Sequence, residues 1–201
     1  MPPPLRPAAI GLRAHSGWAA LVAVAGSFDK PEVIARRRII TADPAIRGSK
    51  QPFHAAEPLD LAEAKLLIDQ CTSSTQRLSR ESIQAAIEGL ADKRAKAIRC
   101  AITTGSGRKL PDLAGILASH ALIHTAEGEF FRDALIEAAA QCGLPIHAVK
   151  EKELLARAAA EFKLTPEALL RRLAEIGKPL GPPWTQDQKF AALAAWLALS
   201  V

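Results

Sequence analysis

Two histidines and a carboxylate stand at helical spacing in the second half of the chain. His120, His124 and Glu127 occupy positions i, i+4 and i+7, in a polar group that interrupts an otherwise apolar stretch. On one continuous helix these side chains would share a face, and two imidazoles with one carboxylate are a ligand set suited to Zn²⁺ or Fe²⁺. The spacing therefore predicts a divalent metal site.

The same segment also has a purely structural interpretation. Residues 120–126 could form a loop between two helices, with histidines capping backbone groups and residues 125–129 forming the acidic start of the second helix. Histidine and glutamate often fall at such spacings by chance. Both interpretations stay open at this point. If the chain is catalytic, the candidate carboxylates are Glu127, Glu129 and Glu151.

A second polar group lies where two short apolar runs meet. Arg13, His15 and Ser16 stand between the runs, and backbone amides around Ser16 could bind a ligand anion with help from the Arg13 guanidinium. An ordinary hairpin turn with polar surface residues explains the same pattern. Residues 105–109 likewise resemble a phosphate-binding turn but lack its full glycine, lysine and serine pattern, so we expect a flexible connector there.

Composition limits the classes of protein that fit. Three cysteines lie far apart without any CxxC spacing, which argues against a disulfide framework or a zinc ribbon and favours reduced thiols in the cytoplasm. No apolar stretch approaches the roughly 20 residues of a membrane helix. The formal net charge of +5 mildly favours an anionic partner, such as nucleic acid or a phosphorylated ligand. We expect the arginines at 36–38 to be a solvated strand edge rather than a nucleic-acid stripe.

The elements that must position these residues follow from the spacing of apolar residues. We expect strands at residues 8–12, 18–25, 33–41, 96–103 and 144–149. We expect helices at residues 59–90, 111–119, 127–141, 150–162, 165–176 and 185–199, the first of them weakest at residues 72–75. With residues 1–7 as a flexible leader, residues 8–201 would form a single domain with C-terminal helices.

This order of elements resembles that of the ribonuclease-H-like superfamily. Ile10 to Ala19 is similar to the first hairpin of its Holliday-junction resolvase branch, in which an Ile-Gly-x-Asp strand turns into a second strand. Leu144 to Lys152 resembles the fifth strand and acidic turn of that branch, and Lys189 to Ala195 resembles its last helix. The resemblance implies an α/β fold with a mixed five-stranded sheet, three antiparallel strands and then parallel strands, flanked by helices.

The catalytic acids of that branch are not matched. These nucleases use carboxylates to hold two divalent cations during phosphodiester hydrolysis. Here Arg13 stands at the position of the first-strand aspartate. The last-helix aspartate falls on Lys189 or Phe190, although Asp187 is close by, and only Glu151 is retained. A guanidinium repels metal ions, so the resemblance implies a fold whose usual site has been dismantled or rebuilt.

Three hypotheses for the function follow. The leading one is a ribonuclease-H-like domain that binds nucleic acid or a phosphorylated partner without two-metal cleavage. The second is a metal-assisted hydrolase or nuclease, with a divalent metal as cofactor and a site rebuilt around His120, His124 and Glu127. The third is a non-catalytic assembly subunit whose last helix is apolar on several faces from Phe190 to Leu199 and packs on another chain, which could be a second copy in a homo-oligomer.

Overall fold

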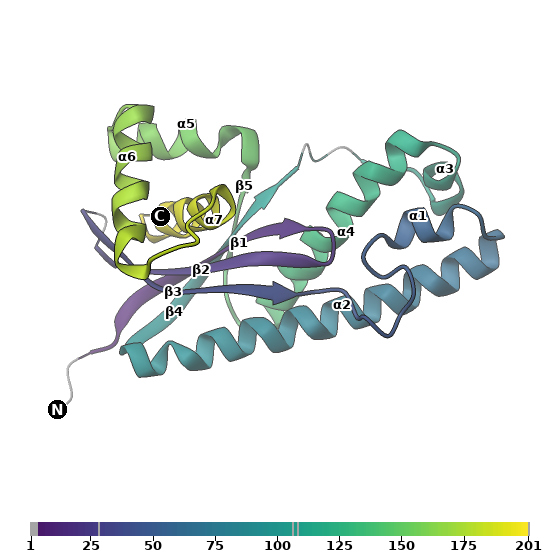
Figure 1. Ribbon diagram of the computed structural model, residues 1–201, viewed down its shortest axis with the longest axis horizontal. Helices are drawn as coiled ribbons and strands as arrows, with labels where there is room; N and C mark the ends of the chain where they lie inside the picture. The colour runs from purple at the N-terminus through teal and green to yellow at the C-terminus, as the bar shows by residue number, and fades with distance from the viewer. Residues whose placement is uncertain (1–3, 28, 106, 108, 201) are drawn as a thin grey trace.

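The computed structural model describes the chain except residues 1–3, 28, 106, 108 and 201, and within it five strands form one mixed sheet (Figure 1). The strands are β1 (Arg6–His15), β2 (Trp18–Ser27), β3 (Lys30–Ile40), β4 (Ala95–Thr104) and β5 (Ile146–Lys150). Their order is β3-β2-β1-β4-β5. The pairs β1–β2 and β2–β3 are antiparallel, whereas β1–β4 and β4–β5 are parallel. The predicted fold class is therefore confirmed.

Helices cover both faces of this sheet. They are α1 (Pro52–Ala56), α2 (Leu61–Gly89), α3 (Leu113–Leu117), α4 (His120–Gln141), α5 (Glu151–Phe162), α6 (Pro166–Gly177) and α7 (Gln186–Leu199), with 3₁₀ turns η1 (Ala91–Lys93) and η2 (Lys178–Leu180). One face packs against α2 and α4, and the opposite face packs against α5, α6 and α7. α4, which carries His120 and His124, therefore lies on one face of the sheet, and α5, which begins with Glu151, lies on the other.

The structure adds the short helix α1, which was not expected, and defines several other elements more closely. β1 begins at Arg6, two residues before the predicted start, because its backbone N–H donates to the carbonyl of Arg94 at 2.9 Å. α2 is unbroken, since the hydroxyls of Thr72 and Ser73 donate to carbonyls one turn earlier and leave the helix intact. α4 begins at His120, so the interpretation of residues 120–126 as a loop is wrong.

The face of the sheet that carries Arg13 follows from alternation along β1. Ile10 and Leu12 are buried toward α2 and α4, whereas Ala9 is buried toward α7. Because successive side chains of a strand point to opposite faces, Arg13 and His15 share the face of Ala9. They therefore stand at the carboxyl end of β1, on the side covered by α7.

α7 lies against the middle strands of the sheet and is buried on all sides. It packs on β1, β2 and β4, and α5 and α6 cover its outer side. Trp196 is fully buried and stacks on Phe162 with 4.2 Å between ring centroids. The apolar residues of Phe190 to Leu199 are thus used within the chain, which corrects the expectation that they pack on another one. Within the described residues, every helix is too short or too polar to cross a bilayer.

Candidate functional site

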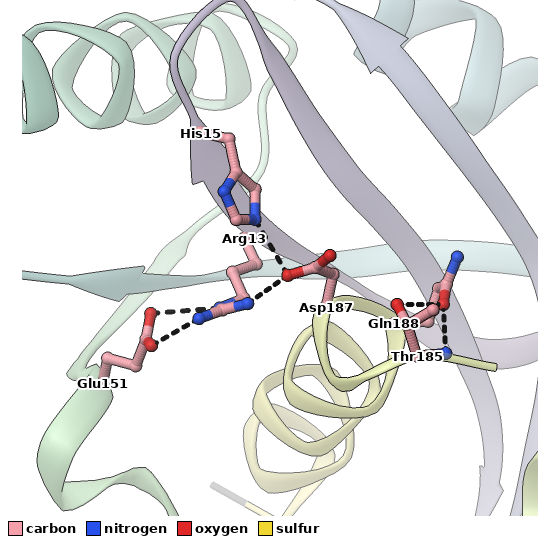
Figure 2. A network of polar contacts seen from close by, with 6 residues as sticks. All are labelled: Arg13, His15, Glu151, Thr185, Asp187 and Gln188. Carbon is pink, nitrogen blue, oxygen red and sulfur yellow. Dashed lines mark hydrogen bonds and ion pairs between the residues drawn. The ribbon is translucent and has the colours of Figure 1, made fainter.

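Three elements bring charged side chains together at the carboxyl end of β1 (Figure 2). Arg13 extends from β1, Glu151 is the first residue of α5, and Asp187 lies in the first turn of α7. Arg13 Nε donates to Glu151 Oε2 at 3.1 Å, and Nη2 donates to Oε1 at 2.7 Å. Its Nη1 donates to Asp187 Oδ1, and His15 Nε2 lies 2.9 Å from the same oxygen. One guanidinium therefore joins two carboxylates.

The start of α7 is fixed in place by close packing and by a cap. A Cβ on Gly11 would lie 1.8 Å from the carbonyl oxygen of Ala191, so only glycine allows α7 to approach β1 this closely. Asp187 is one helical turn before Ala191, and Arg13 is two residues after Gly11 on the same face. A capping box closes the start of α7, in which Thr185 N–H donates to Gln188 Oε1 at 2.6 Å.

In this group the positive charge of Arg13 compensates the negative charges of Glu151 and Asp187. The hydrogen bond from Arg13 holds the pKa of Glu151 below its ordinary value, and the same bond raises the pKa of Arg13. The Arg13 side chain is only 16% exposed, and its guanidinium also lies over the ring of Phe190, 5.4 Å from the centroid. Arg13 is thus paired with two carboxylates of the chain itself, and a role in holding a ligand anion stays a prediction.

The ion pairs identify the acidic residue of the last helix that reaches Arg13. The sequence comparison placed the aspartate position at Lys189 or Phe190, but Asp187 is the carboxylate that reaches the centre. Divalent ions would need the space between Asp187 and Glu151, and the Arg13 guanidinium fills it with a fixed positive charge. The arrangement stabilises the meeting of β1, α5 and α7.

A group of imidazoles lies on the other side of the hairpin turn. Because α4 is continuous, His120 and His124 lie one turn apart with their rings edge to face and 3.1 Å between their Nε2 atoms. His54 of α1 joins them, and one ring nitrogen from each of the three histidines lies within 4.8 Å of the others. Sequence spacing predicted the first two residues. It could not reveal His54, which reaches the group only through the tertiary packing of α1 on α4.

Glu127 supports His54 and does not belong to the ring of nitrogens, which corrects the predicted ligand set. Its Oε1 accepts the backbone N–H groups of Phe53 and His54 at 2.8 and 3.1 Å and lies 3.2 Å from His54 Nδ1. Glu127 is 4% exposed, and this burial raises its pKa although those hydrogen bonds oppose the change. It therefore holds α1 against α4 and orients the His54 ring.

The remaining candidates lie elsewhere around the same edge. Glu129 pairs with Arg132 at 3.3 Å and lies beside Gly105, away from the histidine nitrogens. In the turn of residues 105–109, positions 106 and 108 are outside the described residues. Cys71 and Cys100 are buried and Cys142 is half-buried, and burial raises the pKa of Cys100 to about 12.

Arg36 and Arg38, in the run of arginines at 36–38, contact other residues of the chain. Arg36 donates to the backbone carbonyls of Leu180 and Gly181 at 3.0 and 2.9 Å, and so anchors the loop before α7 to β3. Arg38 lies over the Trp18 ring, with its guanidinium carbon 3.8 Å from the centroid. These contacts favour the structural interpretation of the run over a nucleic-acid stripe.

Three adjoining hollows run along this edge of the molecule. The first, of about 550 Å³, is lined in part by Arg47, Lys50, Gln51 and His54. The second, of about 240 Å³, shares Gln51 and His54 with it and adds His15, Ser16, His124 and Arg132. The third, of about 590 Å³, shares Arg132 with the second and adds Glu151, Lys152 and Phe190. We call these hollows the polar track. Of the predicted site residues, His15, Ser16, His124, Glu127 and Glu151 line this track.

Comparison with known proteins agrees with this geometry. No family model matches the chain, and no curated protein matches its sequence. A structure of T. thermophilus RuvC in complex with Holliday junction substrate matches over 96% of this chain and 92% of that chain, with a TM-score of 0.50 and 13% identity. The chain has the ribonuclease-H-like fold. A second Thermus thermophilus RuvC structure matches over 96% and 93% of the two chains, with a TM-score of 0.51 and 13% identity. The resemblance stated from the sequence is confirmed at the level of the fold.

Proposed function

We propose that this protein binds nucleic acid along the polar track and does not cleave it by two-metal chemistry. The observation that carries the proposal is the position of Arg13, which bonds Glu151 and Asp187 at once. A ribonuclease-H-like site that has exchanged its metal ions for an internal cation keeps its shape. It loses the Lewis acid that stabilises the attacking and leaving oxygens of hydrolysis.

The charges of the polar track support the binding half of the proposal. Arg47 and Lys50 are exposed in the first hollow, Arg132 separates the second from the third, and Lys152 is exposed in the third. Cations spaced along an extended surface suit a polyanion, whose counterions are released when phosphates are neutralised. The net charge of +5 has the same sign. RuvC of T. thermophilus, which has this fold, is described in complex with a Holliday junction substrate.

The location and assembly state also enter the proposal. We place the protein in the cytoplasm, because its three cysteines are all free thiols. The alternative of an assembly subunit rested on the apolar surface of α7, and that helix is covered by the sheet, α5 and α6. Nucleic-acid binding needs no such surface, which makes it the better supported function.

Electrophoretic retardation tests the binding directly. A labelled four-way junction and a duplex of the same length are titrated with the full chain in chelator, first at low ionic strength and then across a salt series. We expect retardation that weakens steeply as salt rises, since the contacts are made to phosphates. The absence of any retardation at the lowest ionic strength would refute the proposal.

A further inference from the structure

We propose that His54, His120 and His124 form a binding site for one zinc ion, a role independent of nucleic-acid binding. His120 and His124 come from adjacent turns of α4, and His54 comes from α1. Their candidate ligand nitrogens all lie within 4.8 Å of one another, and the two on α4 are already 3.1 Å apart. Small side-chain rotations would bring all three to about 2.0–2.1 Å from a common ion.

The choice of metal follows from the ligand chemistry. Imidazole nitrogens suit Zn²⁺ and its transition-metal neighbours, whereas Mg²⁺ and Ca²⁺ prefer oxygen ligands. The exposed edges of His120 and His124 keep the site accessible to an ion from solvent. A three-histidine site is therefore chemically distinct from the carboxylate site that a two-metal nuclease would use.

Glu127 supplies the supporting contact that such a site requires. A histidine that binds zinc through one nitrogen usually donates its other N–H to a carboxylate or carbonyl, which fixes the tautomer and the ring plane. The 3.2 Å contact between His54 Nδ1 and Glu127 Oε1 has this form, and it leaves Nε2 of His54 for the metal. Within the described residues, Glu127 Oε2 is buried without a hydrogen-bond partner, so all the hydrogen bonds of this carboxylate are made by Oε1 to Phe53 and His54.

The site would keep one coordination position open. His54 and His124 line the second hollow of the polar track, of about 240 Å³, together with Ser16, Gln51 and Arg132. Three protein ligands with a solvent-facing fourth position are the arrangement in which zinc retains a water molecule. Arg132 would favour an anionic oxygen at that position.

Cobalt and zinc titrations of the full, metal-free chain test the site. We expect one Zn²⁺ per chain by calorimetry and elemental analysis, and with Co²⁺ the visible absorption of a low-symmetry site. His120→Ala and His124→Ala remove exposed side chains, so both variants should fold and each should lose at least tenfold in affinity. Glu127→Gln should weaken binding about 10-fold to 100-fold, as loss of a supporting carboxylate does.

The matched control is His147→Gln, which changes a histidine on β5 outside the group. Its affinity for zinc should equal that of the unchanged chain, and circular dichroism verifies that every variant is folded. Failure of the unchanged chain to bind zinc would overturn the proposal. Undiminished binding in folded His120→Ala and His124→Ala would overturn it equally, because the ion would then have other ligands.

Discussion

The Nε and Nη2 atoms of Arg13 lie 3.1 and 2.7 Å from the two oxygens of Glu151, in a bidentate pair that joins β1 to the start of α5. Nη1 of the same guanidinium bonds Asp187 and so adds α7. Planar guanidinium matches carboxylate geometry well, and charge-assisted pairs of this kind are the stronger hydrogen bonds of proteins. A single cation therefore ties together β1, α5 and α7.

Removal of this cation should destabilise the fold. Arg13→Ala removes the partner of Glu151 and leaves Asp187 only its contact with His15, and we expect a loss of about 1–3 kcal/mol in the free energy of unfolding. Urea denaturation measures it. Arg157→Ala is the control, because its exposed pair with Glu153 is screened by solvent and should contribute little to stability. Equal losses in the two variants would show that Arg13 forms only a surface pair.

Acid should weaken the native state through Glu151. Its pKa is lower in the folded chain than in the unfolded chain, so the unfolded state binds more protons as the pH falls. The stabilisation is fully present above the ordinary glutamate value of 4.5 and is lost as the pH falls through the lower, folded value. Denaturation at a series of pH values should show a shallower acid slope for Glu151→Gln. Identical slopes would mean that Glu151 titrates alike in both states.

The contact between β1 and α7 should tolerate no side chain at residue 11. Gly11→Ala would force the backbone of Ala191 away from the sheet, and we expect a loss of about 1–3 kcal/mol, measured by thermal or urea unfolding. Gly89→Ala in α2 is the control, since its Cβ would meet only the movable end of Arg37 and alanine favours a helix. A Gly11→Ala chain as stable as the control would contradict the close approach.

The polar track should determine the salt dependence of nucleic-acid binding. Lys50→Ala and Lys152→Ala each remove one exposed cation from the outer hollows. Each should weaken binding to any sequence and reduce the slope of log affinity against log salt by about one. Lys93→Ala changes an exposed lysine in η1, near the start of β4 and away from the track, and should leave the slope unchanged. Equal effects of all three would place the contacts elsewhere.

Sequence patterns predicted the sheet because local chemistry determines it. The apolar runs of β1 and β2 meet in a tight turn at Gly17, and parallel strands buried on both faces are continuously apolar. The boundaries were less predictable. Arg6 and Pro7 carry no apolar signal and enter β1 through pairing with β4, and the short helix α1 is held by Glu127 through backbone N–H groups.

The site was predictable only in part, and for a physical reason. Arg13 and Glu151 could be named because each falls on a position that the resemblance to the resolvase branch marks as functional. Their contact, and the addition of Asp187, depend on how closely α7 approaches Gly11. His54 is far from His120 in sequence, and only tertiary packing brings the two imidazoles within 5.4 Å between ring centroids.

The central claim is that Arg13 has taken the place of the catalytic metal ions. Incubation of a labelled four-way junction with the full chain and Mg²⁺ or Mn²⁺, followed by denaturing electrophoresis, tests it most directly. We expect the junction to stay intact under conditions in which it is retarded on a native gel. Strand scission that requires these ions and disappears in Glu151→Gln would contradict the claim.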